Sequence, residues 1–144
     1  MEPNCLFCDI VDGSIPSYKF YEDGQHLGIL DLYPSVRGQA LVLPKRHHGS
    51  YIFTMEPDEY LQLMLASRNV ANLIDTKLGA LRTCMVMEGM EVDHAHIKLY
   101  PIYEVVTAIA EGTIDLNKYR GYISTQHGER ATDADLEKIV KTFQ

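Results

Sequence analysis

Polar and apolar residues alternate along the stretch from Val92 to Pro101, which reads VDHAHIKLYP. Because side chains of an extended strand point to its two faces in turn, this period predicts a strand. One face carries His94, His96 and Lys98, and we expect the other, apolar face to be buried. Pro101 should end the strand, since proline has no amide to donate. Two imidazoles and an ammonium in a row suit metal binding, proton transfer or phosphate binding, with a half-buried strand that merely carries histidine as the alternative.

The size and charge of the chain narrow the class of protein. At 144 residues it is long enough for one domain with a hydrophobic core. The formal net charge of −7 argues against a protein that coats nucleic acid, but it leaves room for a phosphorylated ligand in a local basic pocket. No apolar run is long enough to span a bilayer and no secretion signal opens the chain, so we expect a cytoplasmic protein without a membrane partner.

Two of the three cysteines form the motif Cys5-x-x-Cys8, a spacing typical of metal or redox sites. Redox motifs of this kind usually follow a strand and open a longer helix, and no strand is expected before Cys5. Zinc is therefore the better interpretation if further ligands lie elsewhere, with two unrelated thiols as the alternative. A short helical turn over 9–12 should follow and end at Gly13. Cys84 lies in an expected strand and is better interpreted as a small buried hydrophobe.

Extended segments dominate the first half of the chain. We expect strands over 18–22, 27–32, 39–43 and 81–87, besides the histidine-bearing one. The dipeptide Asp23-Gly24 favours a hairpin turn between the first two. The run KRHH at 45–48 follows the third strand and is the densest basic cluster of an acidic protein. It is either a solvated loop or the source of a metal ligand and of charge that attracts phosphate.

The longest helical pattern runs over 55–78. Pro57 suits its first turn and Gly79 suits its end. Apolar residues at helical spacing predict the core-facing stripe, namely Leu61, Met64, Leu65, Ala71, Ile74 and Leu78. Thr132 suits the N-cap of a last helix, while 105–110 could be a helical turn or a loop and 121–125 a short strand. Antiparallel strands with one long helix and a C-terminal helix predict an α+β fold in a single domain, residues 1–144.

Three segments together resemble the histidine triad (HIT) family of nucleotide hydrolases and transferases. They are CLFCDIVDGSIPSYKFYED, GILDLYPSVRGQALVLPKRHH and GMEVDHAHIKLYP, and their order and spacing agree with the family from Cys5 to about Pro101. The resemblance implies a five-stranded antiparallel sheet with one long helix, usually in a homodimer. It covers the motifs within 5–101 and assigns no role to the C-terminal extension 102–144.

The resemblance also implies a mechanism. His96 matches the histidine that attacks the α-phosphorus of a nucleotide and forms a covalent nucleotidyl-imidazole, which water or another acceptor then releases. Asp31 matches the acid that accepts hydrogen bonds from the ribose hydroxyls, and Ile29 and Leu32 should wall the base pocket. The plainer interpretation of Asp31 is a strand-end acid before a turn. The implied partner is a purine nucleotide or a nucleotidyl conjugate, not a nucleic acid.

A metal site is implied as well. In the zinc-bearing branch that the chain resembles, the ligands match Cys5, Cys8, His47 and His94. A Cys₂His₂ set is closed and tetrahedral, so the implied cofactor is a structural zinc ion. His48 is the next candidate if the match shifts by one residue.

The chain departs from the family pattern at two places. Lys98 stands at the third histidine of His-x-His-x-His, where it supplies a positive charge for phosphate but cannot shuttle a proton near neutral pH unless its pKa is lowered. Glu91 stands where many relatives carry a hydroxyl that touches phosphate, and its carboxylate repels phosphate unless it pairs with Lys98 or turns away. The expected catalytic residues are His96 and Lys98, and the expected substrate-binding residues are Asp31, Ile29, Leu32, Glu91 and Lys98.

Three functions compete. The first is an enzyme that cleaves at the α-phosphate of nucleoside phosphoramidates, dinucleoside polyphosphates or nucleotidyl conjugates. The second is a nucleotide-binding regulatory or scaffold protein in which Lys98 has slowed or stopped the chemistry. The third is a hydrolase whose histidines hold a catalytic metal. A complete Cys₂His₂ set leaves no open metal position, which argues against the third, and retention of His96 favours the first, a HIT-type nucleotide hydrolase.

Overall fold

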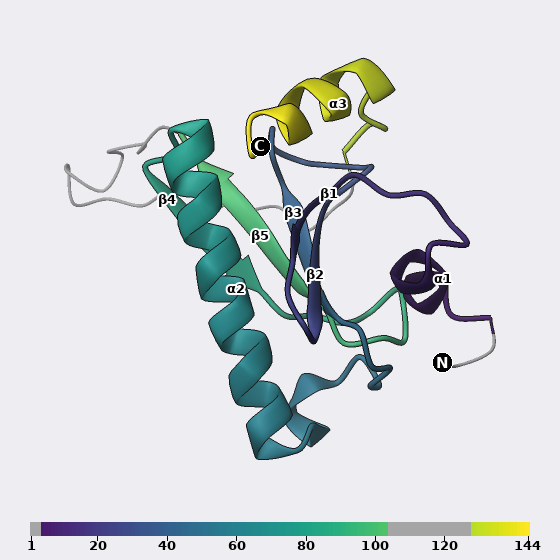
Figure 1. Ribbon diagram of the computed structural model, residues 1–144. Helices are drawn as coiled ribbons and strands as arrows, with labels where there is room; N and C mark the ends of the chain where they lie inside the picture. Colours follow the sequence, from purple (N-terminus) through teal and green to yellow (C-terminus); the bar gives the residue numbers. More distant parts are fainter. Residues whose placement is uncertain (1–3, 104–127) are drawn as a thin grey trace, which may run out of the picture.

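The computed structural model describes residues 4–103 and 128–144. Its elements follow the order α1 (Leu6–Asp12), β1 (Lys19–Glu22), β2 (His26–Leu30), β3 (Ala40–Pro44), η1 (Ile52–Thr54), α2 (Pro57–Leu78), β4 (Arg82–Val86), β5 (Ile97–Ile102) and α3 (Asp133–Lys141). Within these residues the strands form one five-stranded antiparallel sheet in the order β1-β2-β3-β5-β4. The predicted α+β class is confirmed (Figure 1). The segments 105–110 and 121–125 lie outside the described residues.

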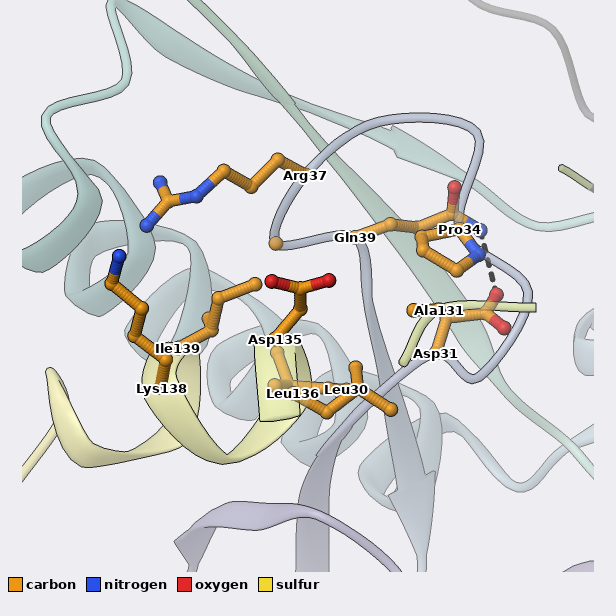
Figure 2. Close-up of a pocket in the computed structure, with 11 residues that line it drawn as sticks. Leu30, Asp31, Pro34, Arg37, Gln39, Ala131, Asp135, Leu136, Lys138 and Ile139 are labelled. Atoms are coloured by element: carbon orange, nitrogen blue, oxygen red, sulfur yellow. Dashed lines mark hydrogen bonds between the residues drawn. The ribbon is translucent and has the colours of Figure 1, made fainter. Parts of the chain in front are cut away.

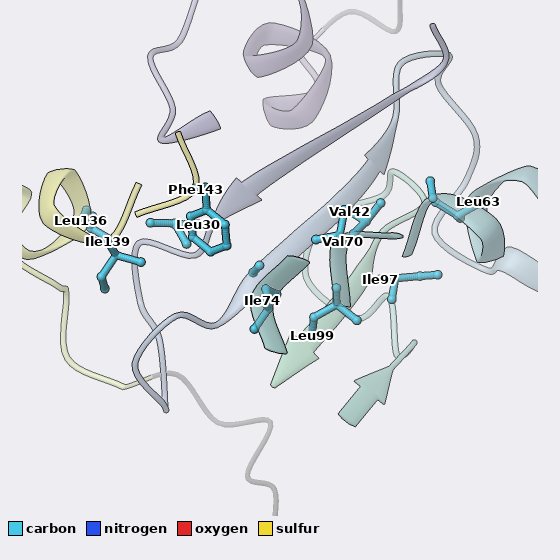
Figure 3. Close-up of a cluster of buried hydrophobic side chains, with 12 residues drawn as sticks. Leu30, Val42, Leu63, Val70, Ile74, Ile97, Leu99, Leu136, Ile139 and Phe143 are labelled. Atoms are coloured by element: carbon cyan, nitrogen blue, oxygen red, sulfur yellow. The ribbon is translucent and has the colours of Figure 1, made fainter. Parts of the chain in front are cut away.

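The sheet separates two apolar clusters. On one face, α2 and α3 pack against inward side chains of the central strands, among them Val42 and Leu99 (Figure 3). On the other face, Phe7 of α1 packs in a second cluster with Leu41 and Leu43 of β3. Successive residues of β3 point to opposite clusters because the side-chain period of a strand is two, and all five of its residues are buried.

The buried face of α2 differs from the predicted one. Leu61 is 53% exposed and Leu65 is 46% exposed, so their assignment to the core is wrong. The buried residues of the helix are Leu63, Ala66, Ser67, Val70 and Ile74. Three members of the predicted stripe, Met64, Ala71 and Leu78, are partly buried beside this line. Small residues at 66 and 67 allow the helix to approach the sheet closely, and the Ser67 hydroxyl is satisfied by donating to the Leu63 carbonyl at 2.8 Å.

The histidine-bearing stretch is buried on both faces, contrary to the expected half-exposed strand. His94 is 0% exposed, His96 3% and Lys98 4%, because this stretch lies on the sheet face that α1 covers. The regular strand begins only at Ile97, after both histidines. Pro101 does not end it, since Pro101 pairs with Thr83 of β4. The pairing of β5 with β3 stops at Leu99, so the proline lies where β5 has one partner strand, a position that tolerates a missing amide.

The C-terminal segment docks beside the loop that follows β2. The amide of Ala131 donates to the Leu32 carbonyl at 2.9 Å, and the Tyr18 hydroxyl donates to Asp133 at 3.0 Å. The predicted N-cap is confirmed, because the Thr132 side chain accepts from the Asp135 amide at 3.1 Å. In the described part of the chain, no helix combines the length and the apolar character needed to cross a bilayer.

Candidate functional site

Two cysteines and two histidines meet at one end of the sheet. The ligand atoms of Cys5, Cys8, His47 and His94 all lie within 4.8 Å of one another. The thiol sulfurs of Cys5 and Cys8 lie 3.4 and 3.7 Å from Nδ1 of His94, and that of Cys8 lies 3.5 Å from Nδ1 of His47. Zinc bonds of about 2.3 Å to sulfur and 2.0–2.1 Å to nitrogen place the two atoms about 3.5–3.6 Å apart at a tetrahedral angle. The donor set and its spacing therefore fit a closed zinc site.

Neighbouring groups prepare His94 to act as a ligand. Its Nε2 lies 2.9 Å from the Pro44 carbonyl, to which it can only donate, so Nδ1 is left with its lone pair toward the thiols. Burial lowers the pKa of His94 to about 4, which keeps the ring neutral at physiological pH. His48, the alternative ligand, is outside the cluster, with its ring 3.4 Å from Glu59. Cys84 is also outside it and is only partly buried.

His96 is held with one ring nitrogen toward a cavity. Its Nδ1 donates to the carbonyl of His94 at 2.7 Å, so the proton is on Nδ1 and Nε2 carries the lone pair. Burial lowers the pKa of His96 below its usual value, which favours the neutral ring. The ring of Phe7 meets it edge-on, with 5.2 Å between ring centres. A neutral imidazole with a fixed tautomer can act as a nucleophile or a base.

The cavity beside His96 has a volume of about 230 Å³ and gathers every predicted substrate-binding residue. Apolar side chains form most of its wall, together with a few polar groups. The predicted residues in its lining are Ile29, Asp31, Leu32, Glu91, His96 and Lys98. Leu6, Phe7 and Ile10 of α1 form a wall that the sequence reasoning missed. The spacing of these three residues around the cysteines, typical of one helix face, was the available signal.

Asp31 is buried at the rim of this cavity and its carboxylate is held from both sides. Oδ1 accepts from the amide of Tyr33 at 2.8 Å, and Oδ2 accepts from Nε2 of Gln39 at 2.6 Å. Among the described residues, the Asp31 side chain carries the one buried carboxylate. Gln39 was not singled out from the sequence, because a glutamine at a strand start carries no distinctive pattern.

Lys98 forms its ion pair with Glu88, and Glu91 is a more distant neighbour. The ammonium donates to Oε1 of Glu88 in a short contact, whereas Oε2 of Glu91 lies 4.0 Å away. Glu91 is therefore a distant ion-pair partner of Lys98, and the sequence did not reveal Glu88 as the nearer one. The strand register explains the contact, because Val86 pairs with Lys98 and Glu88 lies just beyond that pair.

Tyr100, two residues after Lys98 in β5, has a buried hydroxyl. Among the described residues its oxygen is the buried side-chain polar atom without a hydrogen-bond partner. Burial, with nearby negative charge led by Glu88, raises the pKa of Tyr100 to about 12, so the hydroxyl stays protonated.

Comparison with known proteins finds one matching family and relatives within it. Residues 12–105 match the family model described as the HIT domain. An uncharacterized HIT-like protein of Mycobacterium tuberculosis is 38% identical over 103 residues, which cover 67% of this chain and 70% of that protein. The adenosine 5′-monophosphoramidase HNT1 of Saccharomyces cerevisiae is 32% identical over 103 residues, 70% of this chain and 64% of that protein.

Two solved structures extend the comparison to the fold. A hypothetical histidine triad nucleotide-binding protein of Sulfolobus tokodaii superposes with a TM-score of 0.76 at 24% identity, covering 96% of this chain and 89% of that one. A Zn-bound histidine triad family protein of Mycobacterium smegmatis gives a TM-score of 0.68 at 22% identity, covering 97% and 93%. At these identities the likeness is one of fold.

Proposed function

This chain belongs to the HIT domain family, and on that premise we propose that it is a nucleotide hydrolase that cleaves at an α-phosphate through His96. The observation that carries the proposal is the fixed tautomer of His96 in the wall of a cavity that also holds Asp31. The yeast relative's name, adenosine 5′-monophosphoramidase, supports nucleoside phosphoramidates as the substrate class. Dinucleoside polyphosphates and other purine nucleotidyl conjugates are further candidate substrates, because they too can be cleaved at the α-phosphate.

The reaction has two steps. The Nε2 lone pair of His96 forms a bond to the α-phosphorus while the bond from phosphorus to the leaving nitrogen or oxygen breaks, and the leaving group takes up a proton. Water then attacks the phosphorus, the bond to Nε2 breaks, and a nucleoside 5′-monophosphate leaves with the neutral ring restored. The carbonyl of His94 holds the Nδ1 proton throughout and stabilises the positive ring of the intermediate.

The other polar residues have separate tasks in this proposal. Asp31 accepts from the ribose hydroxyls, and Ile29 and Leu32 contact the base. Lys98 binds the phosphate as a charge, with Glu88 holding its ammonium in place. Glu91 is the half-exposed acid at the phosphate side of the cavity.

We assign the Cys₂His₂ cluster to a structural zinc ion held by Cys5, Cys8, His47 and His94. The ion would fix the N-terminal helix to the sheet and take no part in the reaction, because four protein ligands leave no position for substrate. The name of the mycobacterial Zn-bound structure supports this assignment at the level of the fold. Thiolate ligands require reduced cysteines, which suits a reducing compartment such as the cytoplasm.

We also propose that two copies of the chain form a homodimer.

A mass spectrum tests the chemistry directly. Incubation with an adenosine phosphoramidate and rapid acid-free analysis should show an adenylyl adduct on His96. A nucleotide-binding regulatory protein is the second candidate, favoured by the ion pair that ties up Lys98. That alternative predicts binding of AMP with no adduct and no release of product.

A further inference from the structure

The loop between β2 and β3 holds Asp31 through the side chain of Gln39. Nε2 of Gln39 donates to Asp31 at 2.6 Å, and the Asp31 amide donates to the Gln39 carbonyl at 3.0 Å. Oε1 of Gln39 accepts from the amide and the hydroxyl of Ser35 at 2.8 and 3.0 Å. Gln39 is only 3% exposed. Its amide cannot turn without losing these bonds, so the carboxylate that it touches is kept in one orientation.

Asp31 also stands between two cavities. The cavity beside His96 lies on one side, and a second cavity of about 320 Å³ lies between the loop and α3. Leu30 and Asp31 line both of them, whereas Gln39 lines the second. Figure 2 shows the Asp31–Gln39 hydrogen bond at one end of this second cavity, away from the charged ends of Arg37 and Lys138. Leu30 and Asp31 therefore lie on the boundary between the two cavities, and Gln39 backs Asp31 from the side of the second one.

We infer that Gln39 is the positioning residue that makes the site selective for an unmodified ribose, an inference that rests on the proposed role of Asp31. A carboxylate offers about four lone-pair positions, two on each oxygen. Tyr33 and Gln39 fill one position on each oxygen of Asp31. Counting the contacts within residues 4–103 and 128–144, one position on each oxygen is left, which matches the two hydroxyls of a ribose. A group attached to either ribose oxygen would meet the Asp31–Gln39 pair instead of the second cavity.

The first test compares affinities for AMP and 2′-deoxy-AMP by titration calorimetry. Gln39→Leu keeps the side chain's size and removes the donor, so the preference for AMP should fall roughly three- to tenfold, the worth of one hydrogen bond. Affinity for 2′-deoxy-AMP should change less than about twofold, because that ligand lacks the 2′-hydroxyl and can donate one hydrogen bond fewer to the Asp31 carboxylate. The double variant Asp31→Asn/Gln39→Leu should lose no more of the preference for AMP over 2′-deoxy-AMP than Asp31→Asn loses alone. Gln62→Leu, at an exposed position of α2, is the matched control.

The second test looks for tighter binding of a nucleotide that carries a group on its ribose. Gln39→Ala removes the side chain that backs Asp31 from the second cavity, so a fluorescent 3′-O-methylanthraniloyl-AMP should bind at least about threefold more tightly than it binds the parent protein. A destabilised protein does not gain affinity, which separates this result from general damage. An unchanged AMP preference in a folded Gln39→Leu protein, or no gain in Gln39→Ala, would overturn the inference and leave the proposed function standing. Failure of the parent protein to bind AMP would overturn the proposed function itself, and the inference with it.

Discussion

The ring of His96 is hydrogen-bonded to the main-chain carbonyl of His94, with Nδ1 and the oxygen 2.7 Å apart. The side chain of His94 points at the thiols of the metal cluster, while its backbone sets the tautomer of the neighbouring histidine. One residue thus joins the two parts of the site, and the alternation of side chains along an extended segment is what sends both imidazoles toward α1.

Turnover should depend on pH through His96. Burial lowers the pKa of its ring below the usual 6.5, and only the neutral ring has a lone pair for phosphorus. The rate should therefore be level near neutrality and fall only when the pH drops well below 6.5. A profile of kcat/KM from pH 4 to 8 measures this. An acidic limb centred at or above 6.5 would contradict it, and His96→Ala should lack turnover at every pH while still binding AMP.

Metal analysis should find one zinc ion per chain. Cys8→Ser removes a ligand, so it should remove the zinc and lower the free energy of unfolding by about 3 kcal/mol or more, because binding of a structural metal is folding energy. Cys84→Ser is the control, since Cys84 lies outside the cluster. Thermal melts with and without chelator check the prediction, and metal-replete protein free of zinc would refute it.

Loss of Lys98 should weaken substrate binding and slow the chemical step together. Lys98→Ala removes a charge-assisted hydrogen bond to phosphate worth roughly 1.5–3 kcal/mol, or about one to two powers of ten in kcat/KM. Glu88→Gln should have a smaller effect in the same direction, because the ammonium loses its anchor and keeps its charge.

The same position offers a test of proton donation. Lys98→His restores the family pattern, and histidine can donate a proton near neutral pH. The variant should be faster on substrates with basic leaving groups, as measured by single-turnover kinetics. Equal or lower rates on every substrate would show that Lys98 does not slow the chemistry.

Tyr100→Phe should stabilise the protein by about 1 kcal/mol, because it removes a buried hydroxyl that has no partner. Chemical denaturation of the two proteins gives the difference. A loss of stability would mean that the hydroxyl is hydrogen-bonded in solution. Tyr103→Phe is the contrasting variant, since its hydroxyl donates to the Arg37 carbonyl at 2.9 Å and its removal should be destabilising or neutral.

A homodimer should form at micromolar concentration. β4 is an edge strand of the described sheet; Met85 on it is 42% exposed and Leu81, directly before it, is 62% exposed. Unpaired edges with apolar side chains favour association with a second copy. Sedimentation velocity should give a dimer for the parent protein and a monomer for Met85→Lys. A sharp monomer boundary for the parent protein would count against the proposal.

Much of the fold was readable from the sequence because its signals are local. Turn and strand residues located β1 to β4 to within two residues, Gly79 marked the end of α2 through its left-handed backbone, and Thr132 marked the start of α3 through its capping side chain. The buried face of α2 was not readable in this way. The helix carries apolar residues on more than one side, and only the sheet decides that Val70 is buried while Leu65 is exposed.

Some residues of the candidate site could likewise be predicted from the sequence and others could not. Cys5, Cys8, His47 and His94 were predicted as a group because the resemblance to the HIT family matched them to its zinc ligands, and the structure brings the four together. Glu88 and Gln39 were missed, because an acid and an amide are common residues. Their importance comes from the residues they contact, Lys98 and Asp31, and those contacts depend on how the chain folds between consecutive strands.

The short helix α1 has a metal-ligand side and a pocket side. Cys5 and Cys8 belong to the cluster, while Leu6, Phe7 and Ile10 line the cavity beside His96. On the proposed zinc assignment, loss of the ion would free α1 from the sheet and so open one wall of the cavity beside His96. Scarcity of the ion, or an oxidant that joins the two thiols, would then weaken nucleotide binding as well as the fold. Nucleotide affinity should therefore rise with zinc occupancy, so that the supply of a trace metal would set the active fraction of the protein.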